Sequence, residues 1–174
     1  RDPVCYGGAL RDFDHGMTPN DYDFIGGLPG ESFIQGICRV VGRLSGDLAD
    51  KEIVTVTNTD TQSARLLFNH MGRRIDLHLV SGNVPSVETM ADYGSVGLCS
   101  IAVGQDHKFY TSNRYLQDKY AKTLTIRPDL NNDEYEQAVQ RVAALQKRHP
   151  DFTPILGTPA KNAVGRQWTF AYEG

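Results

Sequence analysis

The first 25 residues constrain the fold more than any other part of the chain. A short apolar run, Val4-Cys5-Tyr6, stops at the pair Gly7-Gly8, and the stretch from Ala9 to His15 has the character of a short helix. Residues 20–25 then alternate polar and apolar side chains with the period of a half-buried strand. The succession of strand, glycine turn, helix and strand predicts a sheet with a helix packed against it.

The composition is that of a globular chain that builds its own core. The sequence has 174 residues, of which 40% are hydrophobic and 22% charged, with a formal net charge of −3. Ordinary hydrophobicity excludes a disordered chain, and the lack of an apolar run of about 18 residues excludes a membrane span. With no signal peptide visible after Arg1-Asp2-Pro3, the default expectation is a cytoplasmic protein with no membrane partner.

The remaining sequence predicts further strands and helices. Helices are expected at 31–44, 115–122 and 133–148, and strands at 52–57, 64–70, 73–80, 98–103, 108–111 and 123–126. In the last helix, the apolar stripe is Val139, Val142, Ala143 and Leu145. The tail from Pro150 is expected to be mostly loop, with Trp168 as a packing residue. The cysteines Cys5, Cys38 and Cys99 are too widely spaced for a zinc knuckle and are predicted to be buried.

These elements favour the α+β class. We expect a small, mixed, twisted sheet with flanking helices, packed mainly on one face. Residues 1–174 are predicted to form a single domain, with a core at about 4–127 and a C-terminal helix and loop-rich tail at 128–174. No repeat, low-complexity segment or linker divides the chain.

Three features could carry chemistry: the turn Gly7-Gly8, the pair Asp21 and Asp23 on one strand face, and Asp76 on a later strand. Each of them alone is weak evidence. Phosphoryl transfer uses two divalent cations about 3.5–4 Å apart, and oxygen-rich sites suit Mg²⁺. Two unit charges about 4 Å apart repel each other by about 4 kcal/mol at an effective dielectric of 20, so a bound cation would stabilise three clustered carboxylates.

The order of these residues resembles a known signature. The run Gly7-Gly8-Ala9-Leu10-Arg11-Asp12, followed by Asp21-Tyr22-Asp23-Phe24, resembles the GG-x-x-R-D…D-x-D pattern of the polymerase-β-like nucleotidyltransferase superfamily. It is most similar to the head domain of tRNA CCA-adding enzymes and bacterial poly(A) polymerases. Arg74-Ile75-Asp76-Leu77 falls where that superfamily has its third carboxylate, and the resemblance extends over residues 4–127. The Arg-Asp-Phe-Thr-x-Asn-Ala stretch is matched only in outline, and the Glu-Asp-x-x-Arg motif for base selection is not evident.

The resemblance implies a nucleotidyltransferase fold and roles for individual carboxylates. Asp21 and Asp23 would ligate two ions, Mg²⁺ or Mn²⁺. Asp76 would ligate the ion nearest the attacking hydroxyl and help to deprotonate that hydroxyl.

The glycine turn and several basic residues are candidates for binding the nucleotide. Gly7 and Gly8 allow backbone N–H groups to approach the phosphates. Arg11 either contacts phosphate or an RNA end, or forms a structural ion pair with Asp12. Lys122, together with Lys119 and Arg127, could line a groove for the triphosphate or the acceptor.

The predicted function is transfer of NMP from a nucleoside triphosphate, ATP among them, to a hydroxyl with release of pyrophosphate. The acceptor stays open among an RNA or tRNA end, a protein side chain and a small molecule, and no feature predicts sequence-specific reading of DNA. One alternative is a catalytically weak module that binds a nucleotide or a partner. The other is a metal-dependent phosphodiesterase built on Asp21, Asp23, Asp76 and His78.

Overall fold

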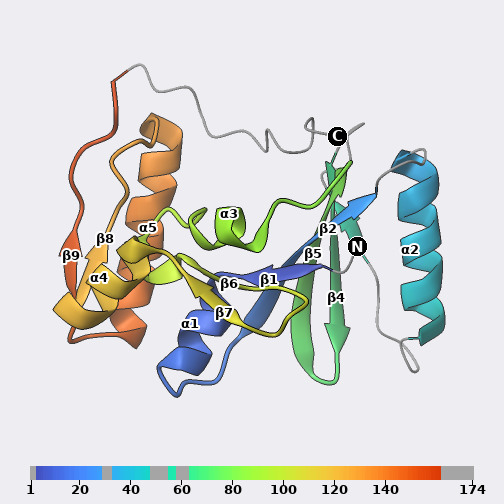
Figure 1. Ribbon diagram of the computed structural model, residues 1–174, viewed down its shortest axis with the longest axis horizontal. Coiled ribbons are helices and arrows are strands. Elements are labelled where there is room, and N and C mark those ends of the chain that lie inside the picture. The colour runs from blue at the N-terminus through green and yellow to red at the C-terminus, as the bar shows by residue number, and fades with distance from the viewer. Residues whose placement is uncertain (1–2, 29–32, 48–54, 58–62, 162–174) are drawn as a thin grey trace.

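A seven-stranded mixed sheet organises the computed structural model, which describes residues 3–28, 33–47, 55–57 and 63–161 (Figure 1). The strand order is β3-β4-β5-β2-β1-β6-β7. The strands are β1 Val4–Tyr6, β2 Asp21–Leu28, β3 Thr55–Thr57, β4 Ser63–His70, β5 Arg73–Ser81, β6 Ile101–Val103 and β7 Phe109–Thr111. Among the described strands of this sheet, only the β2–β5 pair is parallel. The mixed α+β fold expected from the sequence is therefore confirmed.

Five helices and one 3₁₀ turn accompany the sheet in the described part of the chain. They are α1 Gly8–Asp14, α2 Phe33–Asp47, α3 Val87–Ala91, η1 Gly97–Cys99, α4 Asn113–Ala121 and α5 Asn132–Arg148. Every helix predicted from the sequence is present, with shifted ends. None of the described helices has both the length and the apolar character needed to cross a membrane.

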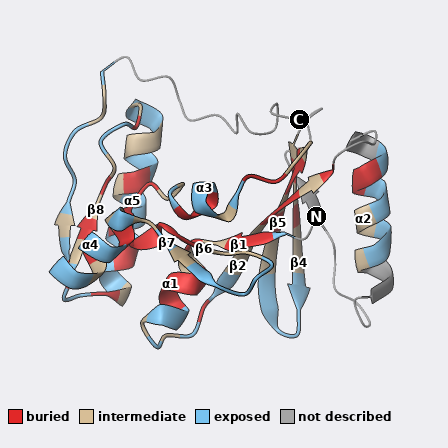
Figure 2. Ribbon diagram, in the orientation of Figure 1, coloured by how far each residue is buried: buried red, intermediate tan, exposed pale blue. Residues whose placement is uncertain are grey.

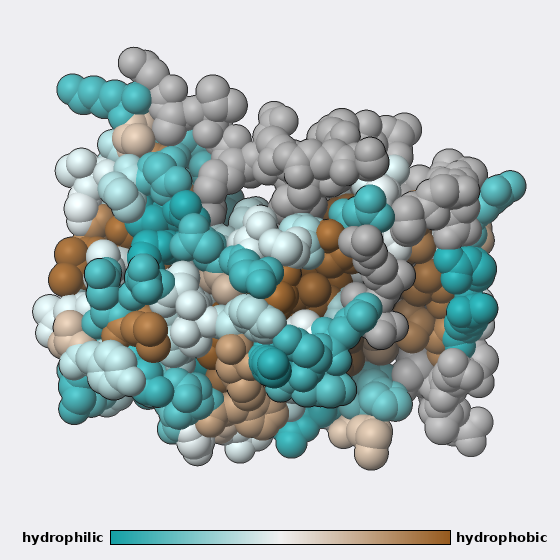
Figure 3. Space-filling view, viewed as in Figure 1, coloured by the Kyte–Doolittle hydropathy of each residue, from teal (hydrophilic) through white to brown (hydrophobic). Residues whose placement is uncertain are grey.

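The two faces of the sheet are covered differently. On one face, Leu10 of α1 and Ile37 of α2 pack near Phe24 and its neighbours, and the apolar side of α2 is turned toward the sheet (Figure 3). On the opposite face, α3 packs Met90 against Ile25 and other buried residues. Since α3 has only five residues, much of this second face is left for a cavity.

Helix α5 belongs to the main core, as its buried stripe shows (Figure 2). Ala138, Val142 and Leu145 are buried in the same cluster as residues of β1, η1 and β8. A capping box between Asn131 and Glu134 fixes the start of the helix. Ala143, predicted to be in the stripe, is exposed instead, because the buried side runs through Ala138, Val142 and Leu145, and Ala143 is turned about 100° away from Val142.

The strand predicted at 98–103 is wrong in its first half. Residues Gly97–Cys99 form the 3₁₀ turn η1, and only Ile101–Val103 is extended. The backbone turns here because the buried carboxylate of Asp118 accepts a hydrogen bond from Leu98 N at 3.0 Å. An acceptor on a distant helix has no signature in the local sequence pattern.

Two further predictions need correction, and others fall outside the described residues. The tail is not only loop, since β9 Thr153–Ile155 pairs in parallel with β8 Thr123–Thr125. Cys5 and Cys99 are buried, but Cys38 is exposed because it lies on the outer side of α2. The early part of the strand predicted at 52–57, the start of the 31–44 helix and Trp168 lie outside the described residues.

Candidate active site

Three aspartates share one face of the sheet. Asp23 and Asp76 are direct partners in the parallel β2–β5 ladder, and Asp21 precedes Asp23 by two residues on the same strand. Side chains two residues apart on a strand point to the same face, so all three carboxylates project from the face that carries α3. The sequence pattern alone could put Asp21 and Asp23 on one face, and the strand register adds Asp76.

Burial and charge both act on Asp23. The pKa of this carboxyl is raised to about 6, first by burial and then by repulsion from Asp21 and Asp76. Burial also raises the pKa of the adjacent Tyr6 hydroxyl, and repulsion from the charges of Asp23 and Asp76 raises it further. The face therefore carries more negative charge than its own surroundings stabilise.

Asp76 has a cationic partner. Arg65 of β4 donates from Nη2 to Asp76 Oδ2 and from Nε to Asp76 Oδ1, the latter at 3.3 Å. Within the described ranges, no group of three or more histidine, cysteine, aspartate or glutamate side chains is arranged to hold a metal ion. The donor set nevertheless suits a hard divalent cation, because it consists of carboxylate oxygens that repel one another.

The glycine turn lies beside these carboxylates. Gly7 adopts a φ of 78°, a left-handed value that favours glycine, and leads from β1 into α1. A side chain on Gly8 would come within 3.3 Å of Arg11 Nη2. Arg11 is itself buried and donates to Asp12 Oδ1 from Nε at 2.9 Å and from Nη2 at 2.7 Å, which is the ion pair considered from the sequence.

Most of the predicted site residues line one cavity of about 720 Å³. It is lined by Gly7, Gly8, Arg11, Asp21, Asp23 and Asp76, together with Tyr6, Arg65, His78 and Tyr93. This volume lies within the range of about 300–1,000 Å³ that is usual for small-molecule sites. The six predicted residues come from both sequence segments that carry the resemblance.

Another wall of the cavity comes from α5, which lies outside the core range of 4–127 predicted from the sequence. Its lining residues are Gln137, Arg141, Ala144, Leu145 and Arg148. The sequence contains a signal for this wall, because four of the lining residues recur at helical intervals of four, three and four: Gln137, Arg141, Ala144 and Arg148. Such spacing makes a continuous helix face directly beside the buried one.

Asp12 ties this wall to the glycine turn. Asp12 is 2% exposed, accepts from Arg11 through Oδ1 and lies 3.2 Å from Arg148 Nη1 through Oδ2. Arg148 also donates to the carbonyl of Thr18, in the loop that leads to Asp21. One buried carboxylate thus connects both walls of the cavity.

Comparisons with known proteins identify the fold. Neither the comparison with protein families nor that with curated proteins finds a match for the sequence. Among solved structures, a CCA-adding enzyme in complex with CTP aligns at a TM-score of 0.57 and 15% identity, over 88% of this chain and 36% of that one. A tRNA nucleotidyltransferase complexed with a primer tRNA and an incoming ATP analogue aligns at 0.53 and 14% identity, over 88% and 43%. This chain has a nucleotidyltransferase fold.

A third structure agrees with this identification. The Thermotoga maritima CCA-adding enzyme complexed with tRNA aligns at a TM-score of 0.53 and 15% identity, over 92% of this chain and 35% of that one. The chain thus spans less than half the length of these neighbours. The nucleotidyltransferase fold expected from the glycine and aspartate motifs is therefore confirmed.

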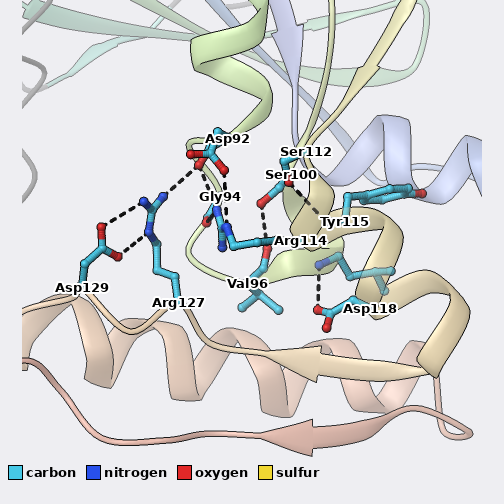
Figure 4. A network of polar contacts seen from close by, with 11 residues as sticks. Asp92, Gly94, Val96, Ser100, Ser112, Arg114, Tyr115, Asp118, Arg127 and Asp129 are labelled. Atoms are coloured by element: carbon cyan, nitrogen blue, oxygen red, sulfur yellow. Dashed lines mark hydrogen bonds and ion pairs between the residues drawn. The ribbon is translucent and has the colours of Figure 1, made fainter.

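In this nucleotidyltransferase fold, a network of polar contacts fixes the segment 92–95, of which residues 93–95 line the cavity. Figure 4 shows Arg114 and Arg127 converging on Asp92. Arg114 Nη2 donates to the carbonyls of Asp92 and Gly94, each at 2.8 Å, and Arg127 Nη1 donates to the Asp92 carbonyl at 2.8 Å. Since Gly94 lines the cavity, the two arginines hold part of its rim from behind.

Three basic residues expected near the triphosphate do not line the cavity. Lys122 ends α4 in a left-handed conformation, with Nζ 3.3 Å from Asp151 Oδ2, and its side chain is 63% exposed. Lys119 Nζ lies 2.8 Å from Asp14 Oδ2. Arg127 pairs with Asp129 in addition to its contact with Asp92. Local acidic partners direct these three side chains elsewhere.

Proposed function

We propose that this chain is a metal-dependent nucleotidyltransferase that moves NMP from a nucleoside triphosphate to a hydroxyl acceptor. The observation that carries the proposal is the alignment of Asp23 with Asp76 on adjacent parallel strands, with Asp21 on the same face and the Gly7-Gly8 turn in the same cavity. The nucleotidyltransferase fold supports it, because two of the neighbours are complexed with CTP and with an ATP analogue.

The residues divide the work by their chemistry. Asp21, Asp23 and Asp76 would hold two Mg²⁺ or Mn²⁺ ions, which when bound activate the attacking oxygen and stabilise the leaving phosphates. Gly7 and Gly8 leave room for the phosphates beside the backbone.

The reaction exchanges one bond to phosphorus for another. The acceptor oxygen forms a bond to the α-phosphorus while the bond from that phosphorus to pyrophosphate breaks. The acceptor proton passes to a base, for which we propose Asp76 because of its place on the sheet face. Arg141, whose charge acts on Asp23, lies on the α5 wall and is available to face the phosphates.

One observation favours a second candidate function. Arg65 binds both oxygens of Asp76, so this carboxylate is already paired. A catalytically weak module that binds a nucleotide or a partner would have the same arrangement. Such a module would bind the triphosphate without releasing pyrophosphate.

Calorimetry tests the proposal first. Binding of each NTP is measured with and without Mg²⁺, for the wild type, for Asp21→Asn combined with Asp23→Asn, and for the control Asp133→Asn. Asp133 is exposed in the first turn of α5, so the control removes a carboxylate outside the cavity lining. We expect NTP binding that needs Mg²⁺ and is lost only in the double variant.

Transfer is then measured with α-labelled NTPs, Mg²⁺ or Mn²⁺, and fractions of RNA, protein and small molecules. The labelled fraction identifies the acceptor, which for RNA agrees with the tRNA bound by two of the neighbours. Pyrophosphate release without a labelled acceptor would indicate hydrolysis. Metal-independent NTP binding with no transfer would favour the binding module and contradict the proposal.

A further inference from the structure

The ion pair between Arg65 and Asp76 occupies the centre of the proposed metal site. The two side chains come from neighbouring strands, β4 and β5, and both line the cavity. Two nitrogens of the guanidinium face two oxygens of the carboxylate, with Nε 3.3 Å from Oδ1 and Nη2 bonded to Oδ2. This fork-to-fork arrangement uses both Asp76 oxygens.

The strand register explains how Arg65 reaches Asp76. The direct partner of Asp76 on β4 is Leu67, whereas Arg65 lies opposite His78, one step along the same face. A long side chain spans such a diagonal in an antiparallel pair. Asp76 therefore has an anionic neighbour, Asp23, on one side and a cationic neighbour on the other.

The pair is unequal in exposure. The side chain of Asp76 is 14% exposed, whereas that of Arg65 is 43% exposed. A half-exposed guanidinium regains water easily when it leaves its partner, so breaking the pair costs little on the arginine side. Asp76, held by its strand, cannot move away in the same manner.

We propose that Arg65 is a built-in counter-ion that holds Asp76 until a divalent cation replaces it, and that it thereby lowers the affinity of the site for that cation. The inference rests on the proposed function, because it needs Asp76 to be a metal ligand. A cation on the Asp76 oxygens would meet the positive guanidinium at the same place. Arg65 must swing toward solvent for the cation to bind, so Arg65 is a positioning residue that acts through Asp76.

Binding of Mn²⁺ in the absence of nucleotide tests this inference. The affinity is measured from the electron paramagnetic resonance signal of free Mn²⁺, for the wild type, Arg65→Met and the control Arg43→Met. Arg43 is exposed on α2, so the control removes the same charge away from the cavity. We expect Arg65→Met to bind Mn²⁺ about tenfold more tightly, because the substitution removes a positive charge from beside the shared carboxylate. The control should match the wild type.

The variant Arg65→Lys keeps the charge without the fork and should lie between wild type and Arg65→Met. The gain should also vanish when Asp76→Asn is added, because the competition then has no shared ligand. A merely structural arginine would instead leave Mn²⁺ affinity unchanged or weaken it when replaced. Circular dichroism and a thermal melt check that each variant is folded.

The outcomes separate the two proposals. If the wild type binds Mn²⁺ but neither Arg65→Met nor Arg65→Lys binds it more tightly, the role of Arg65 is refuted and the proposed function stands. If neither the wild type nor any variant binds Mn²⁺, the metal-dependent function fails and the inference fails with it.

Discussion

At the scale of single residues, Asp23 is the carboxylate whose charged form is most destabilised by burial and by its acidic neighbours. Its pKa of about 6 in the folded chain exceeds the value of about 4 expected for an unfolded chain. Below pH 4 the carboxyl is protonated in both states. As the pH rises from 4 to 6, the folded state holds the proton more strongly, so stability falls, and above pH 6 the full penalty is present.

Replacing Asp23 by asparagine should therefore stabilise the nucleotide-free protein at neutral pH. We expect Asp23→Asn to raise the free energy of unfolding by about 1–2 kcal/mol at pH 7.5, less than the full shift implies because the side chain is only partly buried. At pH 4 the gain should nearly disappear. Urea denaturation at both pH values measures it, and an equal gain at both would contradict the electrostatic explanation.

At the scale of secondary-structure elements, one buried carboxylate joins α4 to η1 and β8. Asp118 is 1% exposed and accepts hydrogen bonds from Leu98 N, Thr125 N and Thr123 Oγ1. Only a glycine fits at position 97, because a Cβ there would lie 2.5 Å from Asp118 Oδ2, closer than real contacts allow. The contact explains why a sequence that looks like a strand turns at this point.

Asp118→Ala should destabilise the fold by about 3–5 kcal/mol, because two buried N–H groups lose their acceptor. Asp118→Asn should cost much less, since its amide oxygen can still accept from both N–H groups while the Thr123 hydroxyl turns to accept. Gln117→Ala, at an exposed position on the same helix, is the control. Chemical denaturation compares the three, and similar losses in Ala and Asn variants would disprove the acceptor role.

Elements with local signals were predictable, and those that depend on distant contacts were not. The hairpin around Met71-Gly72 carries its signal in adjacent residues, and so does the alternation from Asp21 onward. The strand at 153–155 needs a parallel partner about thirty residues earlier, and a local pattern does not indicate one.

The same distinction applies to the candidate site. The aspartates and glycines were predictable because their spacing resembles a known signature. Arg65 was not predicted, because an arginine on a half-buried strand is usually solvated. Only the register of β4 with β5 brings it to Asp76. Lys122 was misplaced because the sequence does not reveal that Asp151 lies nearby.

At the scale of the whole molecule, α5 connects the core to the cavity. Its buried side carries Ala138, Val142 and Leu145, and the adjacent side carries Arg141 and Arg148 into the cavity wall. Because α5 contributes both to the core and to the cavity wall, it cannot separate from the core without opening the cavity. The sheet, the glycine turn and α5 should therefore unfold together.

This coupling gives a last prediction. Val142 is 2% exposed, and Val142→Ala should lower the free energy of unfolding by about 2 kcal/mol through lost packing and a residual cavity. Because α5 shares its core cluster with β1 and β8, we expect one unfolding transition, shifted to lower denaturant with its slope unchanged. Far-UV and near-UV circular dichroism should report the same midpoint. Gln140→Ala, exposed on the same helix, should leave that midpoint where it is. A separate early transition in Val142→Ala would mean that α5 detaches alone, and the cavity would then be a mobile rather than a fixed part of the fold.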